Sequence, residues 1–166
     1  MGRRRPIDDF PALVADLDYP MYVVTADDGT GPSGCLVGFG TQCSIHPPRF
    51  LVGLSKANHT FEPAMNADEL VVHFLDEDDL EVARVFGEET GDAVDKFAQV
   101  AWHPGANGRT PVLDGVRRWF EGRVLERLDA GDHVMVLLEP TAVHVGDHGP
   151  QLGFQAVKDF HPGHPA

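Results

Sequence analysis

The spacing of hydrophobic residues near the start of the chain predicts a short helix over residues 8–17. The apolar positions recur at intervals of three and four residues, as on one face of a helix, and they are Ile7, Phe10, Leu13, Val14 and Leu17. Pro11 falls in or near the first turn, where a missing backbone N–H costs little. The pattern then changes to short apolar runs separated by turn residues.

These runs predict a protein built mainly of β-strands. The segments expected to be extended are residues 22–25, 34–45, 50–54, 70–75, 116–128 and 133–145. Residues 129–132 join the last two as a hairpin turn. Residues 134–138 are apolar on both faces of their strand, which is typical of a barrel wall covered by helices or by a partner subunit.

Short helices are expected between some of these strands. One follows the capping residues Asn58 and Thr60 and runs to Asn66, a second runs from Asp76 to Gly87, and a third covers residues 91–100. The resulting fold class is β-rich α+β with a Greek-key barrel core and short flanking helices. The expected organisation is an N-terminal arm and short helix (1–18), one barrel domain (19–150) and a C-terminal tail (151–166).

Composition narrows the function classes. The 166 residues carry 13 basic and 26 acidic side chains, a net charge of −13, which repels nucleic acid at long range. No apolar run approaches the ~20 residues of a membrane helix, and no apolar segment of a secretory signal follows Arg5. Cys35 and Cys43 would lie roughly 26 Å apart in one extended segment, too far for a disulfide. A reducing cytoplasm fits this cysteine usage.

The first candidate site is a glycine-rich polar segment. Its residues are Gly38, Phe39, Gly40, Thr41, Gln42, Cys43 and Ser44, followed by His46 and two prolines. Glycines let backbone amides approach a planar ligand, so the segment could hold the polar edge of an aromatic heterocycle. A bulged strand that ends at a proline turn explains the same residues.

The second candidate is a loop between a strand and a helix, formed by Ser55, Lys56, Asn58, His59 and Thr60. Free N–H groups at a helix start attract anions, and the lysine adds a positive charge that a phosphate needs in an acidic protein. A well-capped helix beside a solvated lysine is the alternative.

The third candidate is His133, which follows Gly131 and Asp132 at the start of the last long strand. A histidine there could bind a substrate or transfer a proton, or it could simply belong to a turn. No metal site is expected, because the histidine pairs 144/148 and 161/164 lack further ligands at a zinc spacing.

Taken in order, these segments resemble the flavin reductase-like family, whose fold is the FMN-binding split barrel. The resemblance covers about residues 19–145. It includes the polar loop that leads to Pro47 and Pro48, the Ser-Lys-x-x-x-Thr loop that starts at Ser55, and the late Gly-Asp-His that ends at His133. The chain departs from the family pattern at Gly38, Phe39 and His46, which leaves the electron donor and the tightness of flavin binding open.

The resemblance implies an NAD(P)H-dependent reductase of FMN, with FAD left open as the flavin. The isoalloxazine would lie on residues 38–44, the phosphate in the loop of residues 55–60, and His133 near the nicotinamide. The family also implies a homodimer with flavin near the interface, and reduced flavin could serve a monooxygenase. The alternatives are an FMN-binding electron carrier, a split-barrel protein that uses deazaflavin or haem, and an interaction protein with an empty site.

Overall fold

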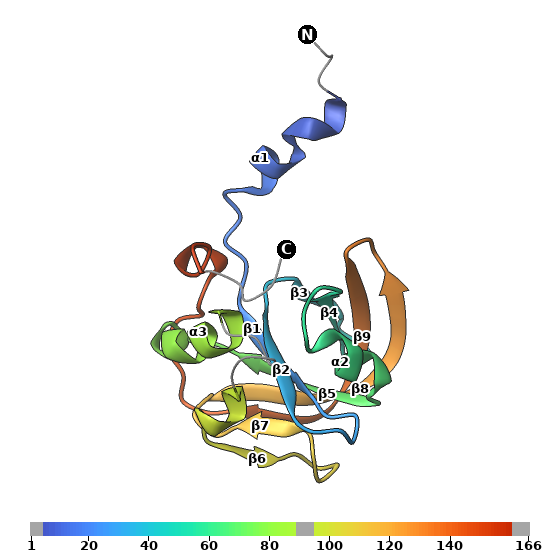
Figure 1. Ribbon diagram of the computed structural model, residues 1–166, viewed down its shortest axis with the longest axis vertical. Helices are drawn as coiled ribbons and strands as arrows, with labels where there is room; N and C mark the ends of the chain where they lie inside the picture. The colour runs from blue at the N-terminus through green and yellow to red at the C-terminus, as the bar shows by residue number, and fades with distance from the viewer. Residues whose placement is uncertain (1–4, 89–94, 161–166) are drawn as a thin grey trace.

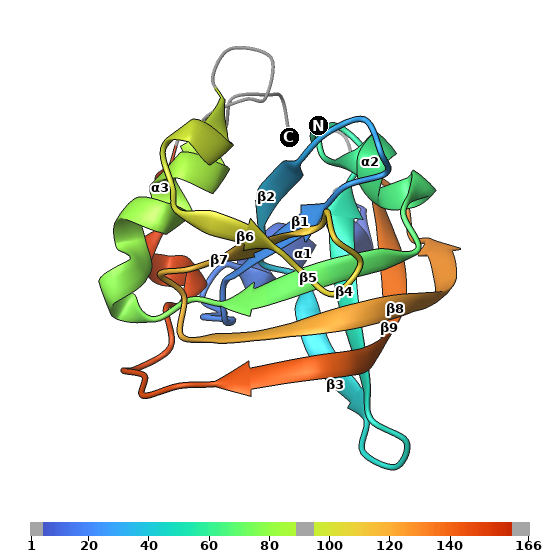
Figure 2. The same ribbon diagram turned by 90° about the horizontal axis from the view of Figure 1, so that it is seen from below.

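A seven-stranded antiparallel sheet dominates the computed structural model, which describes residues 5–88 and 95–160 (Figures 1 and 2). The spatial order of its strands is β2-β1-β5-β8-β9-β4-β3. Their bounds are β1 Tyr22–Ala26, β2 Ser33–Val37, β3 Gly40–Ser44, β4 Arg49–Ser55, β5 Glu69–Phe74, β8 Arg118–Asp129 and β9 His133–Val145. The expected β-rich α+β class is confirmed.

The connection between β2 and β3 closes the sheet into a barrel. These strands lie at opposite edges of the sheet, yet only Gly38 and Phe39 separate them along the chain. Two residues cannot cross a flat seven-stranded sheet, so the two edges must meet. The Gly53 amide donates to the Phe39 carbonyl at 2.7 Å, which continues the pairing of β3 with β4 into this connection. This geometry is that of the expected split barrel.

The prediction of one extended stretch over residues 34–45 is wrong, because the chain changes sheet edge within it. Cys35 therefore lies on β2 and Cys43 on β3, and both are free thiols. Cys35 is buried, and desolvation raises the pKa of its thiol to about 11, whereas Cys43 is exposed.

Two hydrophobic clusters hold the barrel and its cover together. Inside the barrel, the rings of Tyr22, Phe50, Phe74 and Phe120 pack edge-on, with centroids 5.0 to 5.6 Å apart in the four closest pairs. Outside it, η2 (Glu77–Asp79) and α3 (Leu80–Glu88) cover the sheet with Phe86 as the largest buried side chain. The short α2 (Phe61–Asn66) lies near β1 (Figure 2).

The N-terminal helix forms, but it is shorter than expected and points away from the barrel. It consists of η1 (Pro6–Asp9) and α1 (Phe10–Val14), and Figure 1 shows both well clear of the sheet. None of the described side chains of α1 is buried. The sequence predicted the helix from its apolar spacing, but it did not predict that the apolar side chains would stay exposed.

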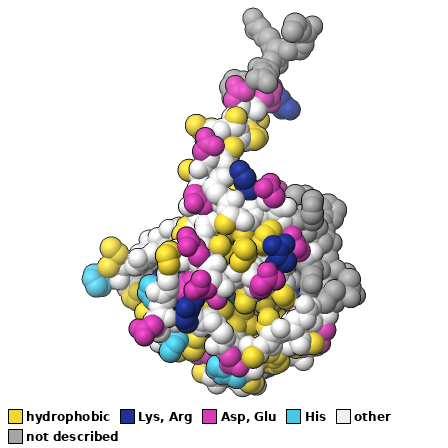
Figure 3. Space-filling model, turned by 90° about the vertical axis from the view of Figure 1, so that its left-hand side faces the viewer, with side chains coloured by type: hydrophobic (Ala, Val, Ile, Leu, Met, Phe, Trp, Pro, Cys, Tyr) yellow, Lys and Arg dark blue, Asp and Glu magenta, His cyan; other side chains and the backbone are white. Residues whose placement is uncertain are grey.

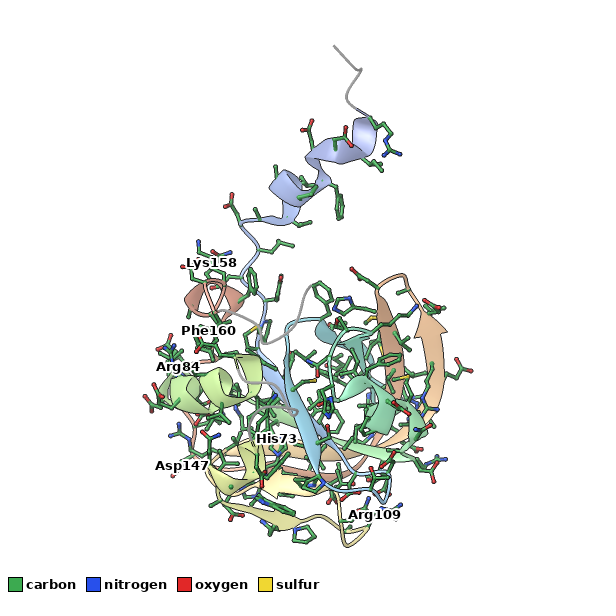
Figure 4. The ribbon with its side chains drawn as sticks, viewed as in Figure 1. His73, Arg84, Arg109, Asp147, Lys158 and Phe160 are labelled. Carbon is green, nitrogen blue, oxygen red and sulfur yellow. The ribbon has the colours of Figure 1, made fainter. Side chains whose placement is uncertain are left out.

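Sequence reasoning missed a hairpin that packs on the barrel. Its strands are β6 (Trp102–Pro104) and β7 (Pro111–Leu113). His73 of β5 is fully buried beneath it, where its Nδ1 donates to the Val23 carbonyl at 2.9 Å and its Nε2 accepts from the Leu113 amide at 3.0 Å (Figure 4). The Thr25 hydroxyl adds a 2.6 Å bond to the Pro111 carbonyl. The hairpin is thus hydrogen bonded to two barrel strands.

The remaining differences lie late in the chain. Of the helix expected over residues 91–100, residues 91–94 lie outside the described residues, and η3 is confined to Lys96–Ala98. On β9, Val134, Val136 and Leu138 are buried, but Met135 and Leu137 on the other face are only partly so, which corrects the prediction of two buried faces. Residues 151–160 pack on the barrel through Leu152, Val157 and η4 (Phe154–Ala156), and residues 161–166 lie outside the described residues.

Candidate functional site

A cavity of about 160 Å³ lies at the barrel seam and brings the three candidate segments together. The seam joins the end of β2, the end of β4 and the start of β9. The cavity is lined by Tyr19, Met21, Cys35, Leu36, Val37, Gly38, Phe39, Gly53, Ser55, Asn58, His133 and Phe154. One residue or more from each candidate segment therefore faces the same space.

Aromatic rings form one wall of this cavity. The ring centroid of Phe39 lies 4.8 Å from that of His133 and 6.0 Å from that of Tyr19, and Tyr19 stacks on Phe154 at 4.7 Å. Gly38 permits this arrangement, because a Cβ there would come within 2.7 Å of the Tyr19 ring. The wall offers flat, apolar surfaces of the kind that planar ligands stack on.

His133 is held in place by its neighbour in the sequence. It pairs with Ser55 across β9 and β4, and its side chain is one-quarter exposed. Its Nδ1 lies 2.7 Å from Asp132 Oδ1, and this hydrogen bond lowers the pKa of the Asp132 carboxyl. A carboxylate on Nδ1 fixes the orientation of the ring and directs Nε2 to other partners.

The loop after β4 is tightly folded on itself. The Ala57 amide donates to Ser55 Oγ at 3.2 Å, the Asn58 amide to the Ser55 carbonyl at 3.1 Å, and the Thr60 amide to Asn58 Oδ1 at 2.9 Å. Thr60 is almost fully buried, and its hydroxyl accepts from Ser33 Oγ at 2.9 Å. Of the expected phosphate ligands, Thr60 therefore faces the barrel.

Lys56 is partly engaged by an acidic partner. Its Nζ lies 2.8 Å from Asp129 Oδ1, and this bond lowers the pKa of the Asp129 carboxyl. Both side chains are substantially exposed, so the pair is weak and an anion can compete for the lysine. Lys56 also lines a hollow of about 550 Å³ outside the loop, together with Asp28, Thr30, Ala57, Asn58, His59, Phe61, Glu62 and Pro63.

The expected ring-binding segment is divided between two sites. Gly38 and Phe39 line the seam cavity, whereas Gly40, Thr41 and Gln42 line a separate groove of about 630 Å³. Cys43 lies on β3 but lines neither space, and the same holds for Ser44 among the lining residues described. The division follows from the change of sheet edge between β2 and β3.

Several lining residues carried no recognisable signal in the sequence. Tyr19 and Phe154 are ordinary aromatic residues outside any motif, and Gly53 sits within a strand. Tyr19 and Phe154 meet because the Phe154 amide donates to the Tyr19 carbonyl at 2.8 Å. Such a contact across 135 positions of sequence depends on the fold and on no local pattern.

The described residues also bear on the membrane and metal questions. Within residues 5–88 and 95–160, no helix combines the length and apolar character required to cross a bilayer. Over the same residues, no group of three or more His, Cys, Asp or Glu side chains is placed to hold a metal ion. His144 instead stacks on Trp119 with centroids 5.5 Å apart.

Comparison with known proteins places this fold and cavity in a family. The flavin reductase like domain matches residues 14–161. A probable flavin reductase from Rhizobium meliloti (strain 1021) is 34% identical over 121 residues, which are 72% of this chain and 38% of that protein. An NADH:FMN oxidoreductase from Rhodococcus erythropolis is 30% identical over 122 residues, which are 74% of this chain and 62% of that protein. The chain thus spans between about two fifths and three fifths of these relatives.

A solved structure agrees in fold along nearly the whole chain. The crystal structure of a flavin reductase domain protein from Arthrobacter sp. FB24 superposes with a TM-score of 0.79, at 22% identity, over 95% of this chain and 94% of that one. The family match extends from before β1 to beyond η4 and includes every residue that lines the seam cavity. The chain belongs to the flavin reductase-like domain family.

Proposed function

We propose that the protein is an NAD(P)H-dependent FMN reductase whose flavin site is the seam cavity and the adjoining loop. The observation that carries the proposal is the meeting of Phe39, Asn58 and His133 in one cavity, from three segments far apart in sequence. When bound, FMN accepts a hydride from the nicotinamide and supplies the redox chemistry, while the protein supplies position and electrostatics.

The shape of the site suits a ligand with a flat ring and a polar tail. The seam cavity of about 160 Å³ is smaller than the several hundred Å³ of typical ligand sites, so it holds only part of an FMN molecule. Asn58 lines both this cavity and the hollow beside Lys56. In this arrangement the ring lies toward Phe39 and the phosphate toward Ser55 and Lys56.

The role proposed for His133 is to hold the nicotinamide near the flavin. Asp132 keeps Nδ1 occupied, so Nε2 is the atom available to a ligand amide or to a proton. Ser55 lies opposite His133 on the neighbouring strand, so the strand pairing places the start of the loop beside the histidine. The histidine is a binding residue in this proposal, since hydride transfer itself needs no proton from it.

The cysteines and one relative bear on the compartment and the partner. The chain has two free cysteines, which fits a reducing cytoplasm. Its family includes the reductase component of a trigonelline monooxygenase from Acinetobacter baylyi, 29% identical over 67% of this chain. We propose a homodimer with flavin near the interface, whose reduced FMN can serve a monooxygenase.

The test is an absorbance titration of the purified protein with FMN, followed by addition of NADH or NADPH. A flavin band that binds and then bleaches as nicotinamide is consumed supports the proposal. A bound flavin that NADH and NADPH both fail to reduce contradicts the reductase function and favours an electron carrier. Absence of FMN binding contradicts the flavin site and directs the search to deazaflavin or haem.

Variants locate the site within the same assay. Lys56→Ala should weaken FMN affinity by roughly three- to tenfold, since it removes the cation of the loop while Asp129 limits its contribution. Lys158→Ala is the matched control, because Lys158 is exposed beyond η4 (Figure 4) and lies outside the site. His133→Gln should raise KM for NADH by a larger factor than it weakens FMN affinity. Equal FMN affinities in the two lysine variants would contradict the phosphate position.

A further inference from the structure

The hollow beside Lys56, here called the outer hollow, is where the tail of a bound flavin would continue beyond its phosphate. It has a volume of about 550 Å³ and lies between the β1–β2 turn, the loop after β4 and the start of α2. Asn58 lines both this hollow and the seam cavity, so the two spaces adjoin at that residue. A flavin with its ring in the seam cavity and its phosphate at Lys56 therefore has any longer tail in the outer hollow.

The two common flavins, FMN and FAD, differ only in that tail. FMN ends at one phosphate, which carries nearly two negative charges at neutral pH. FAD continues through a second phosphate to adenosine, and each of its two phosphates carries one negative charge. The volume of the outer hollow lies within the range of roughly 300–1,000 Å³ that is typical of ligand sites, so space alone does not exclude the longer tail. The difference that the protein can detect is the charge of the second phosphate.

Two carboxylates border the outer hollow, from Asp28 in the β1–β2 turn and from Glu62 in the first turn of α2. Hydrogen bonds from the hydroxyl and the backbone amide of Thr30 hold the pKa of the Asp28 carboxyl below its usual value, so this group is charged at neutral pH. These donors are neutral, so they orient the carboxylate without cancelling its charge. Of the described residues that line the hollow, Lys56 is the only lysine or arginine, and it is already bound to Asp129.

Backbone donors beside the outer hollow are engaged within the protein. The Ala57 and Asn58 amides donate to the side chain and the carbonyl of Ser55, and the Thr30 amide donates to Asp28 Oδ1 at 3.1 Å. Phosphates are commonly bound by such amides in turns, where several N–H groups converge on one anion. In the β1–β2 turn the carboxylate of Asp28 already takes that place. A second phosphate would therefore meet negative charge with these amides already occupied.

We propose that Asp28 and Glu62 make this protein select FMN over FAD. Their carboxylates repel the second phosphate of FAD in the outer hollow, whereas the single phosphate of FMN ends at Lys56. The inference deepens the proposed function and rests on it, because it concerns the flavin that the same site binds. It assigns the two carboxylates a role in flavin specificity and none in hydride transfer.

Calorimetric titration of the purified protein with FMN and with FAD tests the proposal without NADH. The parent protein should bind FMN at least about tenfold more tightly than FAD. Asp28→Asn/Glu62→Gln should lower this ratio of affinities by roughly three- to tenfold, mainly through tighter binding of FAD, because two nearby charges are removed. Asparagine keeps an oxygen that can accept the bonds from Thr30, so the turn should be preserved.

Glu81→Gln/Asp147→Asn is the matched control, because it also removes two negative charges, from exposed positions outside the hollow. Glu81 lies on α3, and Figure 3 shows acidic side chains spread over that side of the molecule. The control should leave the ratio of affinities unchanged. Equal affinities of the parent protein for FMN and FAD, or an equal change of the ratio in the two double variants, would overturn the proposal. Failure to bind FMN at all would contradict the proposed function, and this inference with it.

Glu62→Lys separates charge from shape at the same position. Lysine is longer than glutamine, so a hollow that excludes FAD by lack of space would bind it less well in Glu62→Lys than in Glu62→Gln. Charge selection predicts the opposite order, because the lysine attracts the second phosphate. The ratio of FMN to FAD affinity should therefore be lower in Glu62→Lys than in Glu62→Gln. A higher ratio in the lysine variant would overturn the proposal.

Discussion

His73 makes the stability of this barrel depend on pH. It is fully buried, and desolvation lowers its pKa from 6.5 to about 4. Between these two values the unfolded chain binds a proton that the folded chain does not. The free energy of unfolding is therefore highest above pH 6.5 and falls as the pH drops toward 4, by about 3 kcal/mol at full effect.

His73→Gln should remove this part of the pH dependence. The variant should be less stable than the parent at neutral pH, because glutamine cannot reproduce both bonds to Val23 and Leu113. Urea unfolding at several values from about pH 7.5 to 5 should give a flatter profile than the parent protein. His148→Gln serves as the control, since His148 is exposed and should leave the slope unchanged. An equal slope in His73→Gln would show that other groups cause the acid sensitivity.

The sequence identified several residues of the candidate site, but it did not identify the side chains that bind to them. The resemblance to the family implied that Phe39, Asn58 and His133 belong to one site, and the fold brings them to one cavity. The same resemblance placed the FMN phosphate in the loop that contains Lys56 and Thr60. Asp129 and Ser33 reach them from other strands, and only the strand register decides such pairings.

At the scale of elements, the local sequence pattern predicted strands correctly where recognisable turn residues separate one strand from the next. The hairpin of β8 and β9 closes where the Ala130 amide donates to the His133 carbonyl. Its turn residues predicted this hairpin. The break between β2 and β3 carries no such signal. Gly38 and Phe39 continue an extended pattern, and the first bond to the new neighbour, from the Gly53 amide to the Phe39 carbonyl, comes from β4 later in the chain. The hairpin of β6 and β7 was missed because its strands have three residues each.

Gly53→Ala tests whether this seam shapes the site. An added Cβ would lie 2.7 Å from Met135 Sδ and 3.1 Å from Phe39 Cβ, so the Met135 side chain must move and Phe39, which lines the cavity, must give by a few tenths of an ångström. We expect a loss of about 1–2 kcal/mol in stability and a several-fold weaker affinity for FMN. Gly115→Ala is the control, because nothing lies within 4 Å of the Cβ position there. Urea unfolding and flavin titration measure the two effects, and parent-like values for both would contradict a tight seam.

At the scale of the whole molecule, net charge and local charge act on a flavin phosphate in opposite directions. The chain carries a net charge of −13, which repels the phosphate of FMN at long range. Lys56 attracts it only at close range, and Asp129 already offsets much of that attraction. Salt should therefore affect the approach of FMN to the protein mainly by screening repulsion, because the Debye length falls from about 30 Å at 0.01 M to about 8 Å at 0.15 M.

The association rate of FMN should accordingly rise with ionic strength over that range, by roughly two- to fivefold. Stopped-flow measurement of flavin fluorescence follows the rate, and riboflavin, which has the same ring without the phosphate, should show almost no dependence on salt. A rate for FMN that falls with salt would mean that the loop of Lys56 dominates the field, as in proteins that steer anions toward a basic site. Because FMN and riboflavin differ only in the phosphate, the comparison assigns the effect to the charge on the ligand and not to a change in the protein.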